Sequence, residues 1–262
     1  MTSMSNVEPH AALPGIRRIG VADLRMALES GIADFRAMPS YAVFLCLFYP
    51  VAGLLLGGVL LRYDVAPLLF PLVAGFALVG PFAAVGLYEL SRRRERGLDS
   101  SWHHAFDVFR SPARWSILAL GVLLFAIFIA WLLAAEWLYA RTVGTPAPLA
   151  AAAFFNDVFT TGAGWQMIIW GNLIGLVFAV VAMSISIISF PLLLDRHVNA
   201  AVAMLTSVRA VLENPGTMMM WGLIVAASLV AGSIPFLLGL AVVMPVLGHA
   251  TWHLYRRVVI AD

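Results

Sequence analysis

The sequence predicts an all-α integral membrane protein, and two observations carry that prediction. Of the 262 residues, 62% are hydrophobic and only 11% are charged, whereas soluble domains have about 25% charged residues. This composition excludes a soluble globule and a disordered chain, and the single cysteine, Cys46, excludes a disulfide scaffold. The apolar runs are also continuous and lack the two-residue alternation of barrel strands, so the spans are expected to be helices.

Six apolar stretches reach the length of about 20 residues that a helix needs to cross a bilayer. Residues 1–16 are expected to form a disordered cytoplasmic tail, and residues 17–262 a single membrane domain. The tail has no early apolar run, so we expect no cleavable signal peptide. The six predicted spans cover residues 41–61, 67–90, 115–138, 166–194, 217–233 and 235–255.

The arginines predict the orientation of the spans. All 16 basic residues are arginines, and only Arg62 and Arg141 lie outside the N-terminal segment, the loops after spans two and four, and the C-terminal end. This bias places both termini and the two long even-numbered loops in the cytoplasm. The basic loops favour anionic lipid headgroups over nucleic acid as partners.

A weak internal repeat organises the bundle. Three times, an amphipathic segment ending near a proline precedes two spans, giving units of about 21–96, 99–197 and 198–257. The spacing suits a helix lying in the cytoplasmic interface and equally a helix docked on the bundle. The three apolar stripes are Leu24, Leu28, Ile32 and Phe35; Trp102, Phe106 and Phe109; and Val198, Val202, Leu205, Val208 and Leu212.

A candidate polar cluster lies at the cytoplasmic ends of the even-numbered spans, formed by Glu89, Asp195, His197, His249 and His253. Ionisable residues within spans are functional candidates. His249 and His253 are four residues apart, a spacing that lets two imidazoles and a carboxylate bind a metal ion or relay protons. No H-E-x-x-H motif accompanies them, so hydrogen bonding and ion pairing between helices is the favoured interpretation. We expect no bound metal and no cofactor, haem included, because both histidines lie on one helix.

The outer loop between spans three and four is a candidate docking segment. Its pattern fits a short interfacial helix as well as a surface for a partner. The residues that define it are Phe154, Phe155, Asp157, Phe159 and Trp165.

Span four contains small and polar residues that we expect to serve helix packing. Gly171 and Gly175 form a G-x-x-x-G match suited to close helix contacts. Asn172, Ser186 and Ser189 form part of a polar thread, and we expect such side chains to bond back to their own helix rather than to line a pathway.

Three stretches, residues 69–95, 189–196 and 245–253, resemble a family of bacterial predicted integral membrane proteins of unknown function. Members are sometimes labelled as similar to cytochrome c oxidase subunit I, but this chain lacks histidines on several spans for two haems and copper. The resemblance implies a helical membrane topology and an inner-membrane location. It implies no activity and no catalytic residues.

Two functional classes stay open. The chain has no nucleotide motif and no recognisable nucleophile with a base, so we expect a non-catalytic protein. The favoured hypothesis is an accessory subunit or assembly factor of a larger membrane complex. The alternative is a small transporter, channel or lipid-handling protein that uses the polar cluster.

Overall fold

A computed structural model describes residues 13–38, 53–54, 58, 66–144, 151–196, 198–235 and 238–260. The described regular structure is helical apart from one antiparallel bridge between Ile16 and Val259, which confirms the all-α part of the predicted fold class. The helices are α1 (Val21–Ala37), α3 (Ala66–Ala83), α4 (Val85–Glu95), the 3₁₀ helix η1 (Trp102–Arg110), α5 (Arg114–Thr142), α6 (Ala151–Thr160), α7 (Gly162–Ser186), α8 (Ser189–Asp195), α9 (Ala200–Glu213), α10 (Pro215–Ser233) and α11 (Leu240–Val258).

Three stretches of the described residues are long and apolar enough to cross a membrane: α5, the stretch Gly162–Asp195 that contains α7 and α8, and α10. They coincide with three of the predicted spans. The predicted span 67–90 is instead divided at Ala84 into α3 and α4, and the predicted span 235–255 contains a helix only from Leu240. The span 41–61 lies almost wholly outside the described residues, so the six-span bundle and its repeat stay predictions.

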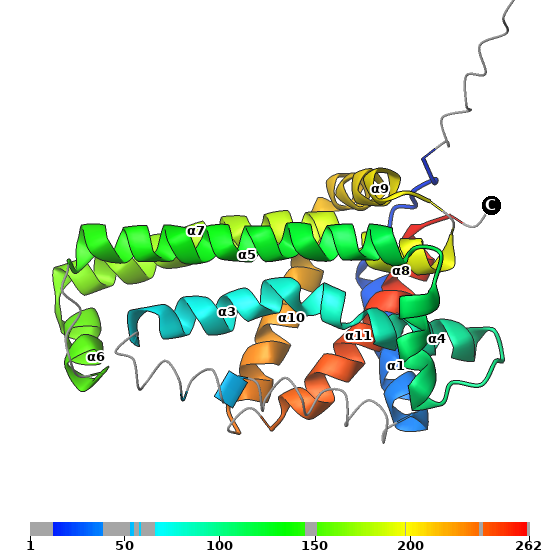
Figure 1. Ribbon diagram of the computed structural model, residues 1–262, viewed down its shortest axis with the longest axis horizontal. Helices are drawn as coiled ribbons and strands as arrows, with labels where there is room; N and C mark the ends of the chain where they lie inside the picture. Colours follow the sequence, from blue (N-terminus) through cyan, green and yellow to red (C-terminus); the bar gives the residue numbers. More distant parts are fainter. Residues whose placement is uncertain are drawn as a thin grey trace, which may run out of the picture.

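The helices divide the molecule into two regions (Figure 1). At one end α1, α4, α8 and α11 pack together, and we call this the junction. From it α5 and α7 extend side by side toward α6 at the far end. The interior of the junction contains large, fully buried side chains, among them Phe190, Trp252 and Tyr255.

Glycines let α3 and α7 approach α5 closely. The indole N–H of Trp131 in α5 donates to the Pro71 carbonyl in α3 at 2.7 Å. A Cβ added to Gly75 of α3 would lie 2.6 Å from Phe128 of α5, and one on Gly175 of α7 would lie 3.0 Å from Trp131. Glycine at such contacts permits the short interhelical distance that membrane helices need for van der Waals packing.

The two described ends of the chain meet at the junction. The Arg17 amide donates to the Val258 carbonyl at 2.8 Å, and the Ile260 amide donates to the Gly15 carbonyl at 2.9 Å. The Ile19 amide donates to the side chain of Asn214, between α9 and α10, at 2.8 Å. Residues 15–19 and 258–260 therefore lie together at one end of the molecule.

The predicted amphipathic stripe of α1 forms part of its contact face, because Leu24 is fully buried and Leu28 and Phe35 pack against core residues. Ala27, Gly31 and Asp34 are buried, whereas Ile32 is partly exposed. A Cβ on Gly31 would lie 2.6 Å from the backbone nitrogen of Ala250 in α11. Helix α1 therefore approaches α11 most closely at Gly31, where a larger side chain would clash, while Leu24 contributes to the core.

In the other two amphipathic segments smaller residues are buried and several residues of the predicted stripes are exposed. In α9 the buried residues are Ala203, Thr206, Ser207 and Ala210, while the predicted stripe residues Leu205 and Leu212 are exposed. In η1 the three-residue turn directs Ala105 and Val108 inward and leaves Trp102, Phe106 and Phe109 exposed. The α-helical spacing assumed from the sequence was wrong for this segment.

Candidate functional site

The candidate site is a buried network centred on Asp34 of α1, which is 3% exposed. The Ser91 hydroxyl of α4 donates to Asp34 Oδ2 at 2.6 Å, and His253 Nε2 of α11 donates to the same oxygen at 2.9 Å. The Arg94 guanidinium of α4 donates to Asp34 Oδ1. One carboxylate thus joins α1, α4 and α11, and a buried charge is tolerated only with such partners.

The hydrogen bonds determine the protonation pattern of His249, which is fully buried. Ser91 has one hydroxyl proton and donates it to Asp34, so His249 Nδ1–H donates to Ser91 Oγ at 2.7 Å. No described group hydrogen bonds to His249 Nε2, and full burial disfavours a charged ring, so Nε2 carries a lone pair rather than a second proton. The imidazole is accordingly neutral with one unpaired acceptor.

Asp34 is ionised in this setting. Burial acts to raise the pKa of Asp34, but the hydrogen bonds from His253 and Ser91 together outweigh it and hold the pKa below its ordinary value. The negative charge faces Arg94 at 41% side-chain exposure, so one side of the ion pair reaches the surface.

A second network joins α4, α8 and α11 around Asp195 and Glu95. The Tyr255 hydroxyl donates to Asp195 Oδ2 at 2.7 Å, and Arg96 donates to Asp195 Oδ1 at 2.9 Å. Arg256 bridges the two carboxylates, at 2.9 Å from Glu95 and 3.2 Å from Asp195. These contacts neutralise both acidic groups and hold the ends of three helices together.

A third group lies along α4 and η1. Glu89 accepts two hydrogen bonds from Arg92, at 2.7 and 2.9 Å. Farther along, His104 of η1 lies between two carboxylates, 2.6 Å from Asp107 and 3.1 Å from Asp99. Hydrogen bonds from Ser101 lower the pKa of Asp99, and the bond from His104 lowers that of Asp107, so both are carboxylates.

The structure brings together only part of the predicted polar cluster. His249 and His253 share the Asp34 network, whereas Asp195 belongs to the second network and Glu89 to the third. His197 lies outside the described residues. Helix α4 supplies residues to all three groups.

Sequence reasoning missed Asp34, Ser91 and Glu95, because it examined charged groups within or beside spans. Asp34 lies in the N-terminal amphipathic segment, where a carboxylate is expected to face the solvent. A usable signal was present: Ala27, Gly31 and Asp34 fall on one face of α1, and small residues mark a close contact.

The predicted docking segment forms α6 and the first turn of α7. Phe154 is turned inward against Tyr139 and Val158, so it presents no surface to a partner. Phe159 and Trp165 are exposed, and Asp157 is half-buried. Phe155 lies in α6, and its side chain is outside the described part.

The polar residues of span four bond back to their own backbone as expected. Asn172 donates to the Ile168 carbonyl at 2.8 Å, and Ser186 donates to the Ala182 carbonyl at 2.6 Å. The Ser189 hydroxyl likewise donates to the Ile185 carbonyl. The hydrogen-bonding capacity of these side chains is therefore used within their own helix, and the helix surface stays largely apolar.

One comparison with known proteins gives a match. Residues 69–195 match a family model described as a predicted integral membrane protein (DUF2189). The match runs from α3 to α8, and therefore includes Ser91, Arg94 and Asp195 but not Asp34, His249 or His253. Neither a curated protein nor a solved structure matches the chain. The expected resemblance to a family of predicted integral membrane proteins is confirmed over this segment, which is just under half of the chain.

Proposed function

We propose that the protein is a non-catalytic accessory subunit or assembly factor of a membrane complex, located in a bacterial inner membrane with both termini in the cytoplasm. The junction would form its cytoplasmic end, since most of the arginines and both described chain ends lie there. Its long apolar helices would hold a membrane-embedded partner.

The distribution of polar groups supports a non-transporting role. The charged residues of the junction pair with one another, and the described polar side chains of α7 bond to their own helix. Helices α7 and α10 contain no Asp, Glu, Lys or Arg. A polar route through the membrane would need such groups turned toward a shared cavity.

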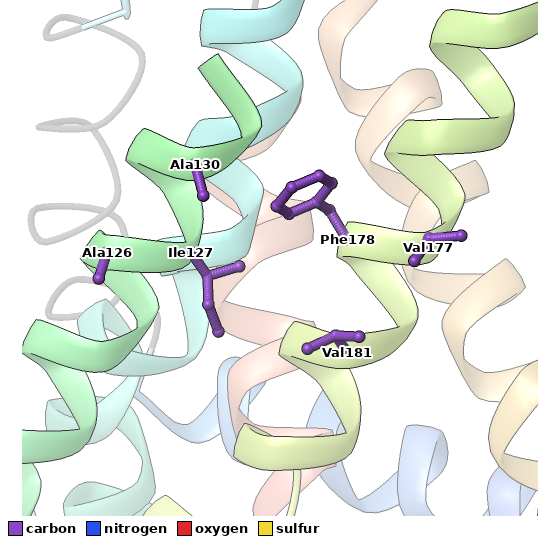
Figure 2. A pocket seen from close by; sticks show the side chains of 6 residues that line it. All are labelled: Ala126, Ile127, Ala130, Val177, Phe178 and Val181. Carbon is purple, nitrogen blue, oxygen red and sulfur yellow. The ribbon is translucent and has the colours of Figure 1, made fainter. Parts of the chain in front are cut away.

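The observation that carries the proposal is an apolar groove between α5 and α7 (Figure 2). It has a volume of about 310 Å³ and an open side, and Ala126 and Ala130 lie one helical turn apart on its α5 wall. Paired small residues let another helix backbone approach closely. The occupant we propose is therefore a transmembrane helix of a partner protein. The lining residues are Ala126, Ile127, Ala130, Val177, Phe178 and Val181.

Photocrosslinking in native membranes tests this proposal. A photoreactive amino acid replaces Ala130, and a matched variant carries it at Ala119, an exposed alanine of α5 outside the groove. We expect a crosslink to one other membrane protein from position 130 and little from position 119. Crosslinks only to lipid, or only to a second copy of this chain, would overturn the proposal.

One observation favours a second candidate, a proton-coupled transporter. His249 Nε2 is buried without a described hydrogen-bond partner beside Asp34 and His253, and an uncommitted imidazole next to a carboxylate is a feature of proton relays. Changing His249 or His253 to alanine would then abolish transport at unchanged membrane levels. Loss of the protein itself would instead indicate a structural role.

A further inference from the structure

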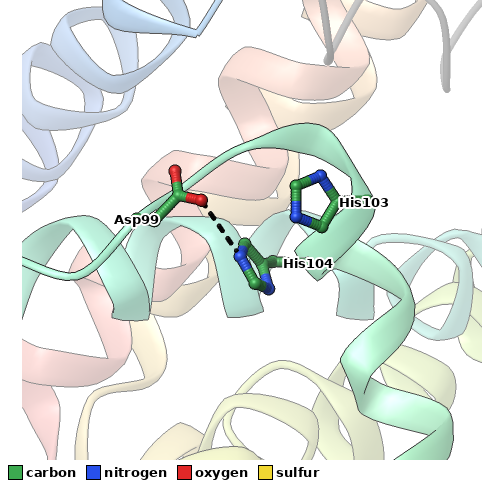
Figure 3. A group of neighbouring side chains, drawn as sticks. All are labelled: Asp99, His103 and His104. Carbon is green, nitrogen blue, oxygen red and sulfur yellow. Dashed lines mark hydrogen bonds and ion pairs between the residues drawn. The ribbon is translucent and has the colours of Figure 1, made fainter.

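We propose that Asp99, His103 and His104 bind one divalent transition-metal ion of the zinc class at the start of η1 (Figure 3). The site lies in the third group of polar residues, and neither the proposed subunit role nor the family match assigns it.

The donor atoms converge. One ligand atom from each of the three residues lies within 4.8 Å of the others. Tetrahedral zinc, with bonds of about 2.0–2.2 Å to nitrogen and oxygen, needs its ligand atoms roughly 3.4 Å apart. Asp99 and His103 are exposed, so both side chains have room to turn by the remaining distance.

The loop orients Asp99 before any ion arrives. The Ser101 amide and hydroxyl donate to Asp99 Oδ1 at 3.0 and 2.6 Å, and Arg93 donates to the Asp99 carbonyl at 2.6 Å. Gly97 permits the turn into this loop through its positive φ of 67°. The other carboxylate oxygen, Oδ2, is the one that faces His104.

His104 has the second contact that a metal-bound histidine requires. Its Nδ1–H donates to Asp107 Oδ2 at 2.6 Å, which directs Nε2 toward Asp99. Metal-binding histidines almost always donate their second ring nitrogen to a carboxylate or carbonyl in this way. Arg93 and Arg110 lie 3.5 and 3.8 Å from Asp107 and help to keep its carboxylate in place. Asp107 is thus a positioning residue that leaves Nε2 of His104 as the atom that would bind the ion.

The donor set selects the ion. Two imidazoles and one carboxylate suit Zn²⁺, Co²⁺, Ni²⁺ or Cu²⁺, whereas Mg²⁺ and Ca²⁺ prefer oxygen ligands alone. Three protein ligands leave a fourth position for water or for a group from a partner.

A Co²⁺ titration of the full chain in detergent tests the site, with a purification tag that contains no histidine and with prior removal of metal by a chelator. Tetrahedral Co²⁺ gives visible absorption bands, and Zn²⁺ displaces it. We expect one Co²⁺ per chain, loss of the bands in His103→Ala and His104→Ala, and an affinity about 10- to 100-fold lower in Asp107→Asn.

Two further variants keep the test decisive. Asp99→Asn is nearly isosteric and exposed, so it reports ligation should a histidine variant fail to fold. His10→Ala removes a histidine distant in sequence and should bind Co²⁺ like the wild type. Absence of bands in the wild type, or equal binding by the His104→Ala or Asp99→Asn variant, would overturn the proposal.

Discussion

The junction and the three apolar stretches, which are α5, Gly162–Asp195 and α10, differ in how much of their surface the chain itself covers. We call these three stretches the apolar helices. In α11 nine of the twelve residues from Leu247 to Val258 are buried. In the most apolar windows of α5, of the stretch Gly162–Asp195 and of α10, only 28%, 33% and 17% of residues are buried within the chain. The junction therefore completes its contacts internally, whereas the apolar helices need lipid or another protein to cover them.

The two regions also treat polar groups differently. The junction buries charged groups, and ion pairs between several helices stabilise them, because an uncompensated buried charge destabilises the folded state. The apolar helices keep hydroxyl and amide groups bonded to their own backbone. Substitutions are thus expected to act on stability at the junction and on association along the apolar helices.

The largest effect is expected from Asp34→Ala. The change leaves Arg94, His253 and Ser91 without their shared acceptor inside the junction, and should cost about 3 kcal/mol of unfolding free energy. Thermal unfolding in detergent, followed by tryptophan fluorescence, measures this loss. A variant as stable as the wild type would show that the network does not hold the junction together.

A close helix contact gives the next effect. A methyl group at Gly31 would lie 2.6 Å from the backbone nitrogen of Ala250, so Gly31→Ala should cost about 1–3 kcal/mol. Gly216 in α10 has nothing within 4 Å of an added Cβ, and Gly216→Ala should be neutral or stabilising by up to about 1 kcal/mol. Equal melting temperatures for the two variants would argue against tight docking of α1 on α11.

The stability of the junction is expected to depend on pH through Asp34. Because the pKa of folded Asp34 is below its ordinary value, the stability it supplies is present above the unfolded carboxyl pKa, about 3.9. This stability is lost as the pH falls through the lower pKa of the folded state. Melting curves should therefore show a steeper acid loss for the wild type than for Asp34→Asn. Parallel curves for the two proteins would contradict the ionised, hydrogen-bonded state of Asp34.

The smallest effect is expected on the exposed face of α1. Glu29 pairs with Arg25 at 2.8 Å, but the two side chains are 58% and 81% exposed. Glu29→Ala should change the unfolding free energy by about 0.3–0.5 kcal/mol, since solvent screens such pairs. This variant is a matched control for Asp34→Ala, because both remove a carboxylate from one helix. A loss as large as that of Asp34→Ala would mean that position on the helix does not matter.

Much of the fold was predictable because hydropathy directly reports which segments avoid water. Three apolar stretches coincide with predicted spans, including the one around Gly171 and Gly175. The divisions at Ala84 and at 187–188 were not predicted, because both lie within continuous apolar runs. Apolar periodicity identified the buried Leu24 of α1, but it misled for α9 and η1, where smaller residues are buried and several large stripe residues are exposed.

The site was predictable only in part, because a sequence shows which groups are ionisable but not which helices meet. That His249 and His253 lie in one network was suggested by their spacing of four residues. Their carboxylate partner, Asp34, is separated from His253 by 219 positions, and nothing local in α1 reveals that contact. The link from Asp195 to Arg96 is likewise non-local.

Co-purification from native membranes in mild detergent tests the central claim, that the apolar helices serve to hold a partner. The recovered proteins would be identified and quantified against this chain. The subunit proposal predicts a companion membrane protein at a fixed stoichiometry, reduced when Ala130→Phe fills the groove and retained with Ala119→Phe. Recovery of the chain alone, from membranes in which it is abundant and folded, would contradict it.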